Sequence, residues 1–172
     1  AAPWIEQHLW WHYLYTGDKE FLKNTAYRFF REVAAFYEDY LCEDEEGELQ
    51  IMPSQSPENR FREHEREICG EIDGAMDFRV SICKSSAMDI ELANDALYYA
   101  IRSAEILGLD PERIVIWKSL KERLPKVKIS SDGRIVEWDT QTRQEVEVGH
   151  RHLSHLYGLY PSEQFTMDKG EA

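Results

Sequence analysis

The first part of the chain carries apolar and aromatic side chains at helical spacing. Ile5, His8, Leu9 and His12 fall at positions i, i+3, i+4 and i+7, so they share one side of a helix. This pattern predicts a helix over residues 4–15, with a proline suited to its first turn.

A short turn separates this helix from a longer one. Gly17 is suited to the left-handed conformation that ends a helix, and Asp18 is a good N-cap for the next. A wide apolar stripe then runs over residues 21–41 and predicts one long helix. That helix ends in the acidic loop 43–48, which is followed by a short extended piece at 49–52.

Helical periodicity returns after residue 84. A helix is predicted from Ser85 or Ser86 as far as Gly108, which closes it. Asp110 can cap a further helix that has Pro111 at its first position and runs to residue 125.

The remaining segments lack helical periodicity. Residues 54–84 form a long irregular stretch, and such stretches within compact domains tend to carry function. Residues 127–138 change to strand-like spacing around the turn sequence SDG at 131–133, which predicts a β-hairpin. A polar loop at 141–148 precedes a predicted short helix over residues 152–160.

One arrangement occurs twice: a helix ends at a glycine and an aspartate starts the next helix, at 17–18 and at 108–110. Repeated αα-hairpins of this kind build bundles, solenoids or toroids. Because long loops interrupt the helices at irregular intervals, a toroid with functional loops is favoured over a regular solenoid. The fold class is therefore predicted as all-α, with one small β-hairpin excursion.

Composition and charge exclude several partners. The 172 residues suffice for one domain, or a piece of a larger one, and include five Trp, nine Tyr and seven Phe, which is typical of a packed globular chain. The net charge of −13 makes nucleic acid an unsuitable partner, because phosphate binding relies on Lys and Arg. No apolar stretch is long enough to span a bilayer, so no membrane partner is expected.

The start of the chain and its cysteines say little about its compartment. The chain opens AAPW, without an initiating methionine or a signal peptide, and we interpret this as an internal or processed start. Cys42, Cys69 and Cys83 have no CxxC spacing, so we expect free thiols, or one pair plus a spare, and no cysteine-based zinc site. The localisation stays unknown.

The segment SQSPEN at residues 54–59 presents the first candidate for chemistry. Its carboxylate, Glu58, follows a proline that stiffens the turn. A proton donor in glycoside cleavage must hold its proton near neutral pH, so burial or neighbouring negative charge would have to raise its pKa. The alternative is a common turn or N-cap pattern without catalytic meaning.

The histidine-rich segment GHRHLSHLYGLYP at residues 149–161 is the second candidate. His150, His152 and His155 give an HxHxxH pattern with Arg151 between the first two. Three imidazoles can bind zinc. They can also donate hydrogen bonds to sugar hydroxyls together with the arginine, or bind the loop backbone in a purely structural role. The sequence leaves these three interpretations open.

The first predicted helix is a third candidate. His8 and His12 share one face, whereas the adjacent Trp10 and Trp11 point in different directions. One indole offers a flat platform on which a sugar can stack, although core packing of both is the simpler interpretation. Asp89 lies in the first turn of its predicted helix, where the helix dipole is sufficient reason for a negative charge. The motifs GxSxG and GxxxxGK[ST] are absent.

Taken together, these motifs resemble glycoside hydrolase family 95, the inverting α-L-fucosidase family. The resemblance runs in order through WIEQHLW (4–10), YTGDKEFL (15–22), PSQSPEN (53–59), AMD (87–89) and the histidine-rich segment 149–161. It covers nearly the whole chain. The last motif is specific, whereas the TGD turn is shared by many helical-toroid sugar enzymes.

The resemblance implies a fold and a set of roles. The fold would be part of an (α/α)6 barrel, and the substrate a fucosylated oligosaccharide or glycan, without cofactor or metal. Glu58 would be the general acid that protonates the glycosidic oxygen. Arg151 and His152, or their neighbour His150, would contact the fucose, and Trp10 or His8 would line the pocket.

The sequence departs from the family pattern in three places. Trp11 stands where an acidic residue is common, and the stretch 60–83 is longer and more acidic than expected. The water-activating asparagines and the assisting aspartate belong to segments outside these residues. We therefore expect 1–172 to be a partial catalytic domain that works with the rest of a parent polypeptide and is inactive alone. The alternatives are a related α-L-galactosidase and a non-catalytic helical carbohydrate-binding module.

Overall fold

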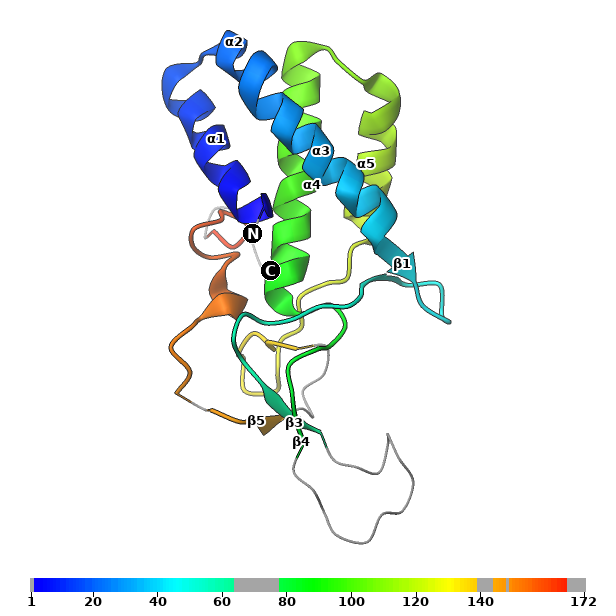
Figure 1. Ribbon diagram of the computed structural model, residues 1–172, viewed down its shortest axis with the longest axis vertical. Helices are drawn as coiled ribbons and strands as arrows, with labels where there is room; N and C mark the ends of the chain where they lie inside the picture. Colours follow the sequence, from blue (N-terminus) through cyan, green and yellow to red (C-terminus); the bar gives the residue numbers. More distant parts are fainter. Residues whose placement is uncertain (1, 64–77, 139–143, 148, 167–172) are drawn as a thin grey trace, which may run out of the picture.

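The structure is a computed structural model that describes residues 2–63, 78–138, 144–147 and 149–166. Four longer helices form its upper part: α1 (Ala2–Thr16), α3 (Tyr27–Tyr40), α4 (Ala87–Leu107) and α5 (Pro111–Arg123). Helices α1 and α4 run in one direction, and α3 and α5 run in the other (Figure 1). The order is thus two successive αα-hairpins, as the repeated turn pattern predicted.

The turn after α1 has the predicted capping geometry. Gly17 is left-handed with φ 66°, and its N–H donates to the carbonyl of Tyr13 at 2.7 Å. The Oδ1 atom of Asp18 accepts from the N–H groups of Glu20 and Phe21, both at 2.9 Å. Helix α2 (Lys19–Phe21), the π-helical turn η1 (Leu22–Ala26) and α3 follow without leaving helical geometry. The long helix is therefore confirmed, with a wide turn that the spacing did not reveal.

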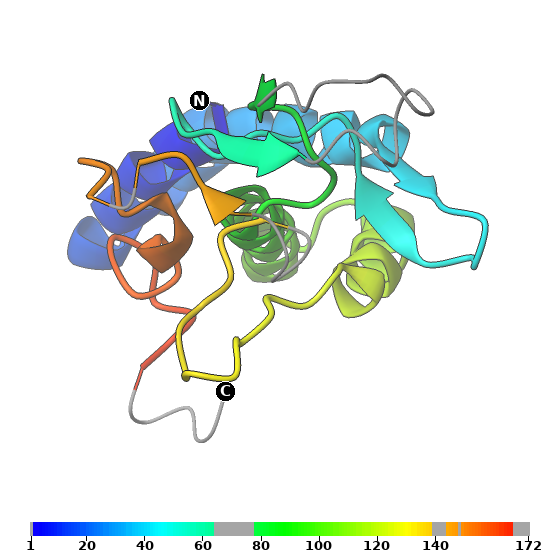
Figure 2. The same ribbon diagram turned by 90° about the horizontal axis from the view of Figure 1, so that it is seen from below.

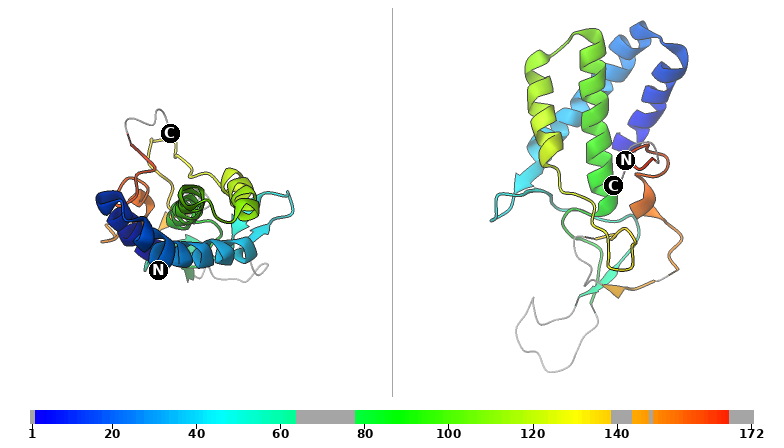
Figure 3. Two further views of the ribbon diagram at one scale, coloured as in Figure 1. Left: turned by 90° about the horizontal axis from the view of Figure 1, so that it is seen from above. Right: turned by 180° about the vertical axis from the view of Figure 1, so that it is seen from behind.

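Helix α4 is the centre of the molecule. It packs against α1, α3 and α5, and a view from above shows it beside the curved row of α1 to α3 (Figure 3). Its alanines at 93, 96, 100 and 104 are fully buried, because small side chains let neighbouring helices approach closely. The helix begins after Ser86 and ends at left-handed Gly108, as predicted.

Helix α5 starts differently from the prediction. Asp110 is left-handed with φ 46°, and its side chain does not cap the helix. Its Oδ2 atom instead accepts a hydrogen bond from the hydroxyl of Tyr27 at 2.5 Å. Trp117 anchors the helix, since its side chain is fully buried and its Nε1–H donates to Glu38 at 2.6 Å.

Two small sheets add more β-structure than predicted. Strands β1 (Leu41–Glu43) and β2 (Leu49–Ile51) form an antiparallel pair around the acidic loop. Strand β3 (Phe61–Glu63) pairs antiparallel with both β4 (Phe78–Val80) and β5 (Gln144–Glu145). Strands of two or three residues are too short to show a period, so the sequence did not reveal the second sheet.

The predicted hairpin and the predicted last helix are both shorter in the structure than the sequence indicated. The hairpin at 127–138 contains one antiparallel bridge between Ile129 and Ile135, with Gly133 at φ 83° in its turn. The predicted helix over residues 152–160 is only a 3₁₀ turn, η3 (Ser154–Leu156), followed by further turns. The described part of the chain is thus mainly helical with small sheets, and it contains no helix long and apolar enough to cross a membrane.

The loops gather at the end of the molecule where α4 begins. A view from below has α4 end-on at the centre, with the segments around 54–59, 127–138 and 149–160 arranged about it (Figure 2). Both polar segments that the sequence singled out therefore lie at the same end of the fold.

Candidate active site

Glu58 is held in an unusual backbone conformation. Its φ is 55°, a left-handed value that few residues with a side chain adopt. Such a conformation is unfavourable and persists only where the surrounding structure fixes it, most often at functional sites. The segment that carries Glu58 is accordingly tied down on both sides.

The N-terminal side of the segment is fixed to the start of α4. Ser54 forms an antiparallel bridge with Cys83, in which both N–H···O distances are 2.8 Å. Its hydroxyl donates to Asp89 at 2.7 Å and accepts from the N–H of Ser86 at 2.8 Å. The carboxylate of Asp89 therefore holds this loop, in addition to lying in the first turn of α4.

The residues on either side of Glu58 are fixed by a buried carboxylate. Ser56 donates through its hydroxyl to Oε1 of Glu137, and the Nδ2 of Asn59 lies 3.1 Å from both carboxylate oxygens. The Glu137 side chain is buried. Glu137 could not be predicted from the sequence, because a single glutamate at the end of a hairpin carries no recognisable signal.

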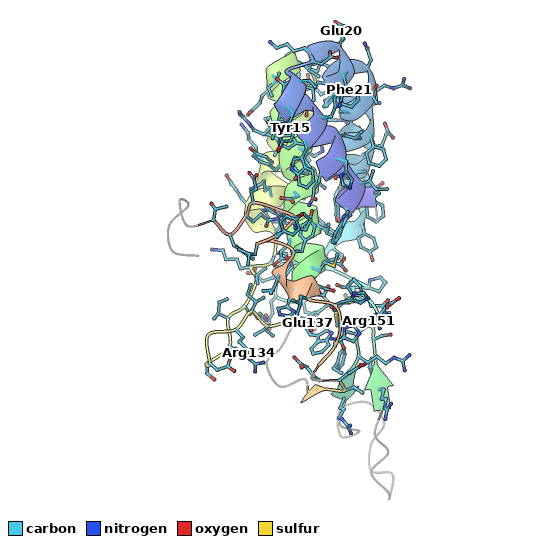
Figure 4. All side chains as sticks on the ribbon, turned by 90° about the vertical axis from the view of Figure 1, so that its left-hand side faces the viewer. Tyr15, Glu20, Phe21, Arg134, Glu137 and Arg151 are labelled. Carbon is cyan, nitrogen blue, oxygen red and sulfur yellow. The ribbon has the colours of Figure 1, made fainter. Side chains whose placement is uncertain are left out.

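The carboxylate of Glu58 meets the histidine-rich segment. Arg151 donates through a guanidinium nitrogen to Oε2 of Glu58, and Nε2 of His152 lies 2.9 Å from the same oxygen. The labelled side chains of Arg151 and Glu137 both lie below the helices, at the end opposite Tyr15 and Glu20 (Figure 4). The structure thus brings together three of the residues named from the sequence.

The charge environment of Glu58 differs from the expectation. The hydrogen bond with His152 and the positive charge of Arg151 lower the pKa of Glu58 below its ordinary value. The carboxylate is also largely exposed. The described surroundings of Glu58 therefore do not supply the burial or negative charge that a proton donor requires.

A cavity of about 530 Å³ adjoins this group. Its lining includes Pro57 and His152 on the two polar segments, and Met88 and Leu92 on α4. The wall is completed by aromatic rings, including those of Trp4 and Tyr157, whose centroids are 5.2 Å apart.

The aromatic residue at the cavity is not the one predicted. Trp10 is packed in the helical core, 7% exposed, with its ring against Phe30 and Tyr99. His8 is exposed and lies edge-on to Trp11. Trp4, at the start of the same motif and 39% exposed, lines the cavity instead. Helical spacing alone could not separate these positions, because the loops below α1 determine which end of the helix reaches the site.

The other two histidines of the segment make different contacts. The Nδ1 of His150 accepts from the N–H of His152 at 3.2 Å, and the two rings are 5.2 Å apart. His155 points elsewhere, with its Nδ1 buried 3.7 Å from Oε2 of Glu137. In the described ranges no three His, Cys, Asp or Glu side chains come together as a metal-binding group.

Three acids on α1 and α4 are buried: Glu6, Glu91 and Asp95. Burial, together with the charge of Asp95, raises the pKa of Glu6 to about 9, and burial raises that of Glu91 to about 8. Asp95 accepts from the Tyr157 hydroxyl at 3.0 Å, and Glu91 accepts from the N–H of Gly158 at 2.9 Å. These bonds fix the end of the histidine-rich segment to α4.

A mainly helical domain that presents a carboxylate beside an aromatic-walled cavity has the features of a glycoside hydrolase. Comparison with known families agrees with this class. The model of the glycosyl hydrolase family 95 catalytic domain matches residues 1–172, and the chain belongs to this family.

Two relatives are similar over most of the chain. Alpha-L-fucosidase 2 of Arabidopsis thaliana is 36% identical over 171 residues, which is 98% of this chain and 19% of that protein. Probable alpha-fucosidase A of Aspergillus niger is 26% identical over 165 residues, 92% of this chain and 18% of that protein. The chain thus spans about a fifth of the length of the curated relatives it matches.

Proposed function

We propose that this chain supplies the proton-donor side of the active site in an α-L-fucosidase-like glycoside hydrolase. The enzyme would remove terminal α-L-fucosyl residues from a fucosylated oligosaccharide or glycan, with inversion at the anomeric carbon. Glu58 is the general acid that protonates the departing glycosidic oxygen. The observation that carries the proposal is the contact of Glu58 with Arg151 and His152 at the mouth of the cavity.

The lowered pKa of Glu58 gives Arg151 and His152 a second role in this proposal. Their contacts favour the charged form of the carboxylate. A bound sugar offers hydroxyl groups that accept hydrogen bonds from both donors, and it excludes water from the carboxylate. Loss of the counter-charge and burial both raise the pKa of a carboxyl group. Sugar binding would therefore prepare Glu58 to hold the proton that it donates.

The cavity is suited to a single sugar ring. A volume of about 530 Å³ lies within the range of small-molecule sites, which is roughly 300–1,000 Å³. Trp4 offers an indole face for the apolar side of the ring, while His152, with Arg151 and His150 beside it, offers donors for its hydroxyls. His8 and Trp10 have no place in this proposal, because Trp10 is a core residue and His8 is not among the residues that line the cavity.

The second half of the reaction is assigned to other parts of the polypeptide. An inverting glycosidase needs a general base that activates water, with roughly 6.5–9.5 Å between the two carboxyl groups. We propose that residues outside 1–172 supply this base and complete an (α/α)6 toroid, to which α1, α3, α4 and α5 contribute two αα-hairpins. No cofactor and no metal take part, and the isolated chain hydrolyses nothing measurable.

Substitution of Glu58 tests the proposal in the complete polypeptide in which these residues occur. With Glu58→Gln, turnover of a fucoside with a poor leaving group should fall by roughly 10²–10⁴-fold, the usual contribution of general acid catalysis. Turnover of a 4-nitrophenyl fucoside, whose leaving group needs little protonation, should fall much less. Glu122→Gln on the exposed side of α5 is the matched control and should leave both rates unchanged.

Two results would contradict the proposal. Equal loss on both fucosides, or no loss on either, would remove Glu58 from proton donation. Turnover of an aryl α-L-galactoside without turnover of the fucoside would overturn the assignment of the sugar.

A further inference from the structure

Glu137 is hydrogen-bonded to residues on both sides of Glu58 and to the start of α4. Its carboxylate accepts from Ser56, two residues before Glu58, and from Asn59, the residue after it. Its backbone carbonyl accepts from the N–H of Ala87 at 3.1 Å, at the first residue of α4. One residue therefore joins the hairpin, the loop that carries Glu58 and the central helix.

The carboxylate also faces the histidine-rich segment. Nδ1 of His155 lies 3.7 Å from Oε2 of Glu137, and the His155 side chain is largely buried. His155 is three residues from His152, which contacts Glu58 directly. Glu137 thus has contacts with both polar segments, the one that carries Glu58 and the one that contacts it.

The backbone conformation of Glu58 explains why hydrogen bonds on both sides of it are needed. A left-handed φ of 55° is unfavourable for a glutamate, so the segment would relax if only one side were held. Bonds from Ser56 and Asn59 to a single buried carboxylate fix both sides at once. Hydrogen bonds to a charged acceptor are stronger than those between neutral groups, and a buried site keeps water from competing for them.

We propose that Glu137 is a positioning residue for proton transfer, acting through Ser56 and Asn59 to aim the Glu58 carboxyl at the glycosidic oxygen. This inference rests on the proposed function, because it assigns Glu137 a part in that same reaction. Glu137 itself is buried, so we assign it no direct contact with the substrate. Its contribution is geometric, and a displacement of the acid of about 1 Å is enough to cost on the order of 100-fold in rate.

The test is Glu137→Gln in the complete polypeptide. The amide keeps the size of the side chain but turns one acceptor oxygen into a donor, which faces the donors of Ser56 and Asn59. We expect kcat on a poor-leaving-group fucoside to fall by about 10- to 100-fold. KM should change little, and kcat on the 4-nitrophenyl fucoside should fall by about threefold or less.

A double variant separates positioning from a general structural effect. If Glu137 acts only through Glu58, adding Glu137→Gln to Glu58→Gln should cost nothing further on the poor-leaving-group substrate, because coupled residues are not additive. Glu6→Gln is the matched control, since Glu6 is another buried acid with no bond to either polar segment in the described structure. Any loss of rate in Glu6→Gln should be the same on both fucosides.

Each outcome decides between the two proposals. Equal losses of Glu137→Gln on both fucosides, together with a lowered melting temperature, would overturn the positioning role. A Glu58→Gln variant without leaving-group dependence would instead overturn the proposed function. If Glu137→Gln does not fold, Ser56→Ala removes one of its bonds and should give the same leaving-group pattern at smaller amplitude, and absence of that pattern would count against the inference.

Discussion

Nε2 of His152 lies 2.9 Å from Oε2 of Glu58, although 94 residues separate the two in sequence. Neither residue belongs to a long helix, so helix packing does not bring them together directly. Both segments are instead fixed to α4: Ser54 through Asp89 and Ser86, and the histidine-rich segment through Glu91 and Asp95 (see Figure 2). The central helix therefore sets the geometry of the candidate site.

Arg151 should control the pH dependence of the proposed reaction. Its positive charge lowers the pKa of Glu58, and a general acid works only while protonated. With Arg151→Gln the pKa of Glu58 in the free enzyme should rise, so the loss of kcat/KM at high pH should begin at a higher pH. The pH profile of kcat/KM is the measurement, made in the complete polypeptide.

Arg134→Gln is the matched control for this charge effect. Arg134 is exposed and paired with Asp132 at 2.8 Å in the hairpin, so its loss should leave the profile in place. If the loss of kcat/KM at high pH began at a lower pH in Arg151→Gln, this loss could not be assigned to deprotonation of Glu58.

Glu6 should make the protein less stable as the pH rises. Burial raises its pKa to about 9 in the folded state, against an ordinary value of 4.5. Between these values the folded state holds a proton that the unfolded state has lost, so the free energy of unfolding falls with pH, by on the order of 1 kcal/mol per pH unit. Below about pH 4.5 both states are protonated, and this effect vanishes.

Glu6→Gln should remove this part of the pH dependence. Urea unfolding at about pH 5 and about pH 8 measures this dependence. On going to the higher pH, the free energy of unfolding should fall less for the variant than for the parent protein. Identical slopes for the two proteins would show that Glu6 does not stay protonated in the fold.

Gly158 should resist substitution because a side chain has no room there. A Cβ atom at this position would approach the ring of Phe165 to 2.5 Å, well inside contact distance. Gly158→Ala should lower the free energy of unfolding by about 1–3 kcal/mol, as for other overpacked sites. Gly149→Ala, in open space in the same segment, should have little effect in the same unfolding experiment.

Asp89 should matter for the loop that carries Glu58. Its Oδ2 accepts from the hydroxyl of Ser54 at 2.7 Å and from the N–H of Gln55 at 3.3 Å. Asp89→Ala should destabilise the protein by about 1–3 kcal/mol, because it leaves these donors without their acceptor and removes a charge favoured by the helix dipole. Thermal unfolding measures the loss, and Asp39→Ala on the exposed surface of α3 is its control.

Much of the helical framework could be predicted from the sequence. The turn at Gly17 and Asp18 and the limits of α4 follow from local rules, because capping bonds and left-handed glycines involve neighbours in the chain. The short strands and the start of α5 did not follow from such rules. Asp110 can cap its own helix in principle, but a hydroxyl from Tyr27 takes its carboxylate instead.

The candidate site was likewise predicted only in part. The motifs named Glu58, Arg151 and His152 together, and the structure brings these three into contact. The family resemblance implied Trp10 or His8 at the pocket, yet the core encloses Trp10 and Trp4 lines the cavity. Which of several similar side chains faces a cavity depends on segments that are far away in sequence.

The amino-acid sequence by itself determined the two αα-hairpins, the turn at Gly17 and Asp18, the limits of α4 and the family to which the chain belongs, since these depend on periodic burial and on short contiguous motifs. Only the tertiary structure decided that Glu58 is paired with positive charge and that Glu137 holds its neighbours. Electrostatic and hydrogen-bonding environments depend on distances through space, and those distances arise when α4 draws separate loops to one end of the molecule.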